Sequence, residues 1–97
     1  MIRVRFEENR LTVCGHAGYA ARGEDIVCAA ASALVFALIG SLRQEENLRE
    51  VVIRPGYVML CAGGACAAEF ALVRCGLEQL QARYGEFVSV ETTVHGS

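Results

Sequence analysis

The feature that most constrains this chain is an uncharged run of 17 residues, IVCAAASALVFALIGSL at 26–42, in a sequence of only 97. The run is slightly short for a membrane span and is rich in Ala, Ser and Gly, so we predict a helix buried on most sides and no membrane association. A chain of this length corresponds to one domain, 1–97, with one modest core. The other segments must therefore supply a surface that covers this helix.

Those segments are predicted to form five strands and a second helix. Alternation with a period of two indicates strands, apolar residues at helical spacing indicate the second helix, and Asp25 is a good N-cap for the first. The predicted elements are strands at 2–6 and 11–15, a helix at 26–42, strands at 48–54 and 57–62, a helix at 66–84 and a strand at 86–94. This ββαββαβ order predicts an α+β fold, a five-stranded, mainly antiparallel sheet packed with two helices. The more apolar first helix is expected to be the more buried.

Charge and cysteine content narrow the class of protein. The formal net charge is −2, the arginines are scattered and there is no lysine, so we expect no direct nucleic-acid binding, which needs clustered cations. The first ten residues, MIRVRFEENR, alternate apolar and charged side chains, unlike a secretory leader, which predicts a cytoplasmic protein. In that compartment the five cysteines stay reduced, so a disulfide framework is not expected.

One connection is longer than the predicted fold requires. Thirteen residues separate Cys14, at the end of the second strand, from Cys28 in the first helix. In the second half of the chain, only four residues separate Cys61, near the end of the fourth strand, from Cys66 at the start of the second helix. Connections in compact domains are usually short, and long ones are often functional. The added length contains His16, the one histidine outside the C-terminal tail. We therefore expect the loop at 16–24 to serve a function rather than the fold.

Cys28 and His16 form a candidate nucleophile and base. Cys28 is predicted in the first turn of its helix, where unpaired N–H groups and the helix dipole favour a thiolate. If the second strand ends beside this helix start, the His16 imidazole reaches the sulfur and can activate it. Backbone N–H groups around Cys28 would then be natural oxyanion donors. The alternative is a small buried cysteine and an ordinary hydrogen-bonded loop histidine.

Asp25, Ser32 and three glycines are candidate supporting residues. Asp25 caps the helix or also orients His16, as the third group of a triad does. Ser32 lies one turn after Cys28 and either lines the site or is a buried serine bonded to helix carbonyls. The glycines that would make the loop mobile are Gly15, Gly18 and Gly23. We expect this loop to pack little, so that a β-branched residue at Gly18 or Gly23 slows turnover without unfolding the domain.

The remaining cysteines raise the alternative of a metal-binding or thiol redox module. Cys14, Cys61 and Cys66 lie at predicted strand ends and a helix start, but no Cys-x-x-Cys motif is present and the spacings match no zinc module. We therefore predict no metal site. Cys75 is predicted to be a core residue, and His95 is expected to be exposed in the tail.

The segment GHAGYAARGEDIVCAAASAL, 15–34, resembles the signature of the ribosomal-processing cysteine protease family, Prp, also called the YsxB-like proteins. The shared pattern is Gly-His-Ala, a glycine-containing loop, and then Gly-x-Asp-Ile-Val-Cys-Ala-Ala-x-Ser. The resemblance implies a single Prp-like domain over 1–97 with the predicted element order. It also implies a cofactor-free cysteine endopeptidase whose Cys–His dyad falls on Cys28 and His16, under a loop that orders on substrate binding.

The resemblance further implies a substrate and an assembly. The expected reaction removes a short N-terminal extension from the precursor of the twenty-seventh large-subunit bacterial ribosomal protein, and the expected oligomer is a homodimer. The residues alone leave two rival interpretations open. One is a non-enzymatic ribosome-assembly module, in which Cys28 is dispensable. The other is the thiol redox or metal-binding module, in which Cys14 or Cys61 matters as much as Cys28.

Overall fold

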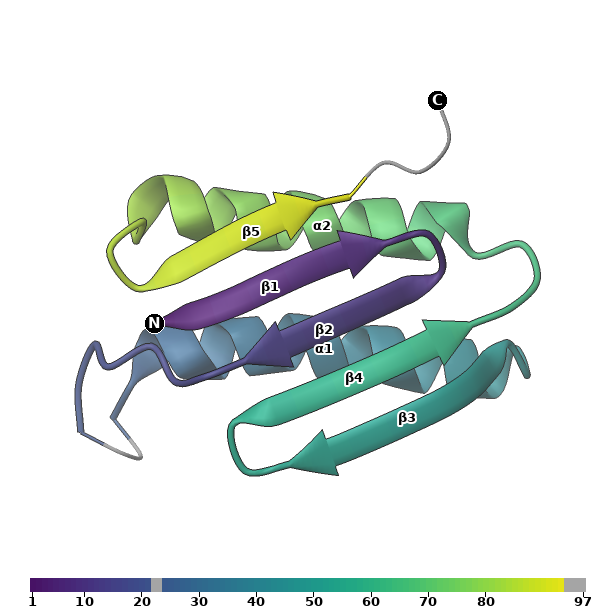
Figure 1. Cartoon of the computed structure of the whole chain (residues 1–97), viewed down its shortest axis with the longest axis horizontal. Helices are drawn as coiled ribbons and strands as arrows, with labels where there is room; N and C mark the ends of the chain where they lie inside the picture. The colour runs from purple at the N-terminus through teal and green to yellow at the C-terminus, as the bar shows by residue number, and fades with distance from the viewer. Residues whose placement is uncertain (22–23, 94–97) are drawn as a thin grey trace.

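The computed structural model describes residues 1–21 and 24–93 of the chain, so Gly23 and His95 lie outside the described residues. Its elements follow the predicted ββαββαβ order (Figure 1). They are β1 (Ile2–Glu7), β2 (Arg10–Cys14), α1 (Ile26–Gln44), β3 (Leu48–Arg54), β4 (Tyr57–Ala62), α2 (Ala67–Arg83) and β5 (Val88–Thr92). The predicted α+β fold is confirmed, with boundaries that differ by one or two residues at most ends.

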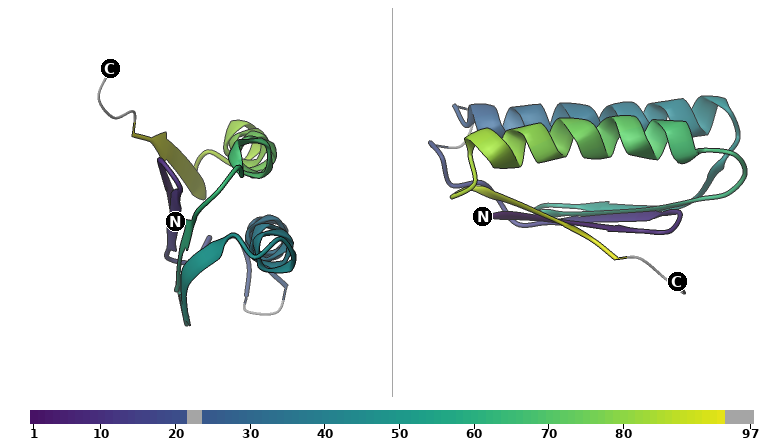
Figure 2. Two further views of the ribbon diagram at one scale, coloured as in Figure 1. Left: turned by 90° about the vertical axis from the view of Figure 1, so that its right-hand side faces the viewer. Right: turned by 90° about the horizontal axis from the view of Figure 1, so that it is seen from above.

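The five strands form one mixed sheet in the order β3-β4-β2-β1-β5. Three neighbouring pairs are antiparallel, and the pair β1–β5 is parallel. Two connections therefore cross over the sheet, β2 to β3 through α1 and β4 to β5 through α2. Both helices lie on the same face of the sheet and leave the other face without a helical layer (Figure 2).

The core lies between the sheet and the two helices. Along β1 the side chains of Ile2, Val4 and Phe6 are buried while the intervening ones are exposed, as the two-residue period predicts. Six α1 side chains are buried, compared with two of α2, which confirms that the more apolar helix is the more buried. The α1 set is Val27, Ala31, Val35, Leu38, Ile39 and Leu42. By length and composition alone, α1 is long and apolar enough to cross a membrane. The core helix of a folded domain meets the same two criteria.

Two sequence predictions are corrected by this packing. Cys75 is exposed rather than part of the core. It lies two positions from both Val73 and Leu77, the buried residues of α2, and such positions fall on the opposite face of a helix. The fifth strand begins at Val88 instead of residue 86, because the N–H groups of Phe87 and Val88 both donate to the Tyr84 carbonyl in a tight turn.

Candidate active site

Cys28 is the third residue of α1, and Asp25 caps that helix as predicted. One carboxylate oxygen of Asp25 accepts the N–H groups of Val27 and Cys28 at 3.1 and 3.0 Å. The Ala29 N–H donates to the backbone carbonyl of Asp25 at 3.0 Å. The N–H groups next to the Cys28 sulfur along the helix are therefore already bonded. Their expected role as oxyanion donors stays a prediction, and it requires these bonds to be exchanged for bonds to the substrate.

Asp25 also ties the loop to the helix start. Its second carboxylate oxygen accepts the Tyr19 N–H at 3.1 Å. The pKa of Asp25 is lowered from its ordinary value of 3.8, chiefly because the carboxylate accepts the Cys28 N–H and then those of Tyr19 and Ala20, while desolvation opposes the shift. These bonds support the helix-cap role and add a role in holding the loop. Within the described residues, the hydrogen bonds of the carboxylate go to the helix start and the loop backbone instead of the His16 imidazole.

This arrangement predicts a pH dependence of stability. The folded-state pKa of Asp25 is depressed, so its carboxylate stabilises the fold above the ordinary value of 3.8 and loses that effect as the pH falls through the lower folded-state value. Asn at this position can cap the helix but carries no charge. We expect urea midpoints of wild type and Asp25→Asn to differ near about pH 7 and to converge only as the pH falls through the folded-state pKa of Asp25, which lies below 3.8. A difference that does not vary with pH would contradict this account.

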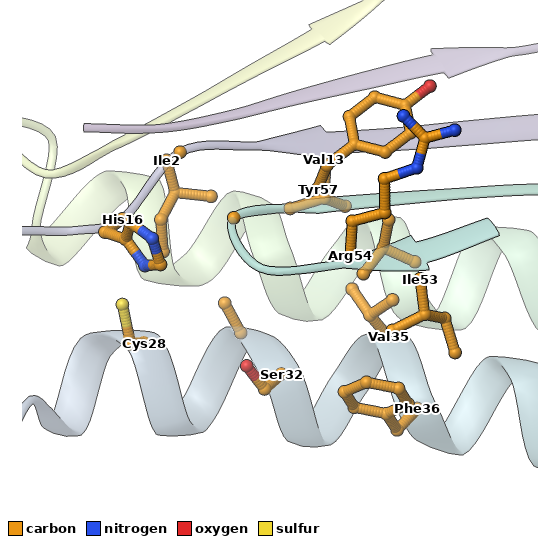
Figure 3. Close-up of a pocket in the computed structure, with 14 residues that line it drawn as sticks. Ile2, Val13, His16, Cys28, Ser32, Val35, Phe36, Ile53, Arg54 and Tyr57 are labelled. Carbon is orange, nitrogen blue, oxygen red and sulfur yellow. The ribbon is translucent and has the colours of Figure 1, made fainter. Parts of the chain in front are cut away.

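His16 lies in the loop two residues after the end of β2, and its side chain faces Cys28. Figure 3 shows the imidazole and the Cys28 sulfur pointing toward one another across the hollow between the sheet and α1. His16 is exposed and Cys28 is half-buried. The predicted juxtaposition of the strand end and the helix start is therefore present in the structure.

Ala17 is a site residue that the sequence analysis missed. Its N–H donates to the Cys28 sulfur at 3.2 Å, and the residue is only 3% exposed. This bond joins the loop directly to the sulfur at the start of α1. An alanine in a loop carries no signal of this role in the sequence. Only its place after a candidate base could have drawn attention to it.

Two of the three predicted loop glycines are described, and both have backbone angles that favour glycine. Gly15 has φ +91°, and a Cβ there would lie 2.3 Å from the Met1 carbonyl oxygen, so the backbone of Met1 approaches Gly15 closely. Gly18 has φ +72°, but open space surrounds the place of its missing side chain. The third, Gly23, lies outside the described residues.

The first half of the loop packs against the domain, contrary to expectation. The Tyr19 ring makes edge-to-face contacts with Tyr84 and Phe87, with ring centroids 5.6 and 5.3 Å apart. Together with the burial of Ala17, these contacts hold the loop on both sides of Gly18. The sequence could not indicate this packing, since both aromatic partners lie more than sixty residues further along the chain.

Cys28 lies between two hollows. One, of about 210 Å³, runs between the sheet and α1 and is lined mainly by apolar side chains that include Val35, Phe36 and Ile53. The other, of about 650 Å³, lies toward the loop and is bounded by Gly18, Ala20, Asp25, Ala29 and Pro55. His16, Cys28 and Ser32 line both. Ser32 is exposed, which favours the lining role over the buried serine considered as its alternative.

The other cysteines have different surroundings. All five cysteines are free, and Cys66 at the start of α2 is buried. Burial raises the pKa of the Cys66 thiol, and the nearby Glu69 carboxylate adds to the shift. Within residues 1–21 and 24–93 there is no group of three or more His, Cys, Asp or Glu side chains that could hold a metal ion.

Comparison with known proteins identifies the family. The profile of the family described as cysteine protease Prp matches residues 1–89. A curated relative, the ribosomal processing cysteine protease Prp of Mycoplasma pneumoniae, is 47% identical over 36 residues, which are 37% of this chain and 36% of the relative. The chain thus aligns with only about a third of the length of that relative.

Solved structures share the fold. The essential ribosomal processing protease Prp from S. aureus, in complex with a covalently linked product peptide, has a TM-score of 0.86 at 21% identity, over 96% of this chain and 100% of that one. The same protease in complex with a substrate peptide has a TM-score of 0.80 at 20% identity, again over 96% and 100%. With the profile match over nearly the whole sequence, these findings show that the chain belongs to the cysteine protease Prp family.

Proposed function

We propose that this chain is a cysteine endopeptidase in which Cys28 is the nucleophile and His16 the general base and acid. The observation that carries the proposal is the geometry at the sulfur. Cys28 faces the His16 imidazole in a shared hollow and accepts the Ala17 N–H at 3.2 Å. Family membership supports the reaction class.

The proposed reaction has two halves. His16 removes the thiol proton, and the Cys28 sulfur attacks the carbonyl carbon of the scissile peptide bond. The tetrahedral intermediate collapses with loss of the C–N bond, and His16 gives its proton to the leaving amine. Water, deprotonated by His16, then attacks the thioester carbonyl. The C–S bond breaks, His16 returns its proton to the Cys28 sulfur, and the acid product leaves. The Ala17 N–H, 3.2 Å from the Cys28 sulfur, is a further proposed donor to the oxyanion that forms beside that sulfur.

We also propose the substrate, the N-terminal extension of the precursor of the twenty-seventh large-subunit ribosomal protein. The support is the resemblance of 15–34 to the family signature and the name of the M. pneumoniae relative, a ribosomal processing protease. The apolar hollow beside Cys28 suits an extended peptide with bulky side chains. Cleavage of a peptide instead of nucleic acid suits a chain with a formal net charge of −2.

The cellular setting is part of the proposal. We infer a cytoplasmic homodimer that needs no membrane. A dimer would cover large apolar side chains that α1 exposes, Ile26 and Phe36. The mass of the purified protein in solution, measured by light scattering, would test the oligomeric state.

The test of function is cleavage of a synthetic peptide that spans the end of the extension, followed by mass spectrometry. We expect wild type to cleave it at one bond and Cys28→Ser to leave it intact. Cys14→Ser and Cys61→Ser are the matched controls and should cleave normally. Equal loss in these controls would favour the redox or metal module. Failure of wild type to cleave would favour the non-enzymatic ribosome-assembly module.

A further inference from the structure

The turn between β3 and β4 lies against the His16 ring, although forty positions separate the two in the sequence. Gly56 in this turn has φ +70°. A Cβ built on it would lie 3.0 Å from His16 Nε2 and 3.6 Å from both Cδ2 and Cε1. All three of these atoms belong to the imidazole. The ring therefore occupies the space that any side chain at position 56 would enter.

The same glycine holds the backbone that carries the histidine. The Gly56 carbonyl accepts the Gly15 N–H at 2.8 Å, immediately before His16 in the chain. Gly56 also lines the apolar hollow together with His16 and Cys28. The β3–β4 turn thus bonds to the backbone of Gly15, next to His16, and lies close to the His16 ring. The close-up in Figure 3 shows this hollow with the imidazole above Cys28.

We propose that Gly56 is a positioning residue that determines where the His16 imidazole lies relative to Cys28. This inference rests on the proposed function, in which His16 is the base. A contact at 3.0 Å is tighter than nine in ten Cβ contacts in proteins, so the ring would have to move by a few tenths of an ångström. Proton transfer depends steeply on such placement, since a misplacement of about 1 Å can slow a reaction about 100-fold.

Two substitutions at Gly56 separate the side-chain contact from backbone strain. Gly56→Ala adds the Cβ and also strains the left-handed backbone. Gly56→Asn adds the same Cβ, but Asn tolerates the left-handed region better. Gly64→Ala is the matched control, because Gly64 has φ +75° and its Cβ would meet the Asn47 side chain instead of His16. We expect both Gly56 variants to lower kcat/KM by up to about 10-fold, and Gly64→Ala to cleave like wild type.

A double-mutant comparison tests whether the effect passes through His16. In the wild-type background, Gly56→Ala should slow alkylation of Cys28 by iodoacetamide, a readout that needs no peptide. In the His16→Ala background it should change nothing. The inference would be overturned if both Gly56 variants cleaved the peptide at the wild-type rate. It would also be overturned if Gly56→Ala slowed alkylation of Cys28 equally with His16 present and in the His16→Ala background.

The imidazole proton signals of His16, assigned by comparison with His16→Ala, test the positioning itself. They should move in both Gly56 variants and stay in place in Gly64→Ala. Unmoved signals in the Gly56 variants would overturn the positioning role. If His16→Ala cleaves the peptide normally, the proposed dyad is wrong, and these signals still decide whether Gly56 positions the ring.

Discussion

Removing either member of the proposed dyad is expected to reduce kcat/KM for the peptide by orders of magnitude. For Cys28→Ala the loss should be at least about 10⁴-fold, because no other group can form the thioester. For His16→Ala it should be roughly 10²–10⁴-fold, the usual contribution of a general acid–base. The two losses should not add in the double variant, since the base has no role without its nucleophile.

A second readout of the dyad needs no substrate. Each cysteine is labelled with iodoacetamide near neutral pH, and its rate is followed by mass spectrometry. Of these cysteines Cys75 is exposed, Cys28 is half-buried and Cys66 is buried, so exposure alone would make Cys75 the fastest of the three to react. We expect Cys28 to react faster than Cys75 despite its lower exposure, and to lose that advantage in His16→Ala. Equal Cys28 rates in wild type and His16→Ala would contradict the assignment of His16 as the base.

Gly15→Ala is expected to have the largest effect on stability. Its Cβ would lie 2.3 Å from the Met1 carbonyl oxygen, a backbone atom just before β1 in a peptide group whose N–H, that of Ile2, donates to the Phe87 carbonyl. The free energy of unfolding should fall by roughly 2–5 kcal/mol, because the variant both overpacks this contact and places a side chain in the left-handed region. Cleavage should fall as well, because Gly15 directly precedes His16.

Gly18→Ala is the matched control for Gly15→Ala. Gly18 also has a positive φ, of +72°, but its Cβ would meet no atom within 4 Å. Gly18→Ala should lower the free energy of unfolding by about 1–2 kcal/mol, the contribution of backbone strain alone. Urea unfolding monitored by circular dichroism measures both variants. Equal destabilisation would show that the contact with Met1 is not what requires glycine at position 15.

The two helix starts of this fold show what distinguishes the site. A cysteine lies at each, Cys28 within the first turn of α1 and Cys66 at the N-cap of α2. Only the first is preceded by a long loop that brings a histidine and an N–H group to the sulfur. Cys66 is buried, and its thiol has a raised pKa. The loop, with its histidine and its N–H donor, is therefore what sets the surroundings of Cys28 apart from those of Cys66.

The sequence by itself determined the features that depend on neighbouring residues. The element order follows from local periodicity, and the Asp25 cap acts within three residues. The pairing of His16 with Cys28 could be predicted from one connection. The loop at 16–24 is longer than the fold requires, and it joins the strand end next to His16 to the helix start that carries Cys28. The exposure of Cys75 could also have been read from its spacing to Val73 and Leu77, although the prediction was a core residue.

Only the tertiary structure decided which distant segments meet. It placed β5 parallel to β1, set Gly56 against His16, and seated Tyr19 on Tyr84 and Phe87. Periodicity shows which face of a strand or helix is buried but not which element covers it. That choice depends on strand order and on contacts between residues tens of positions apart, for which a single sequence carries no local signal.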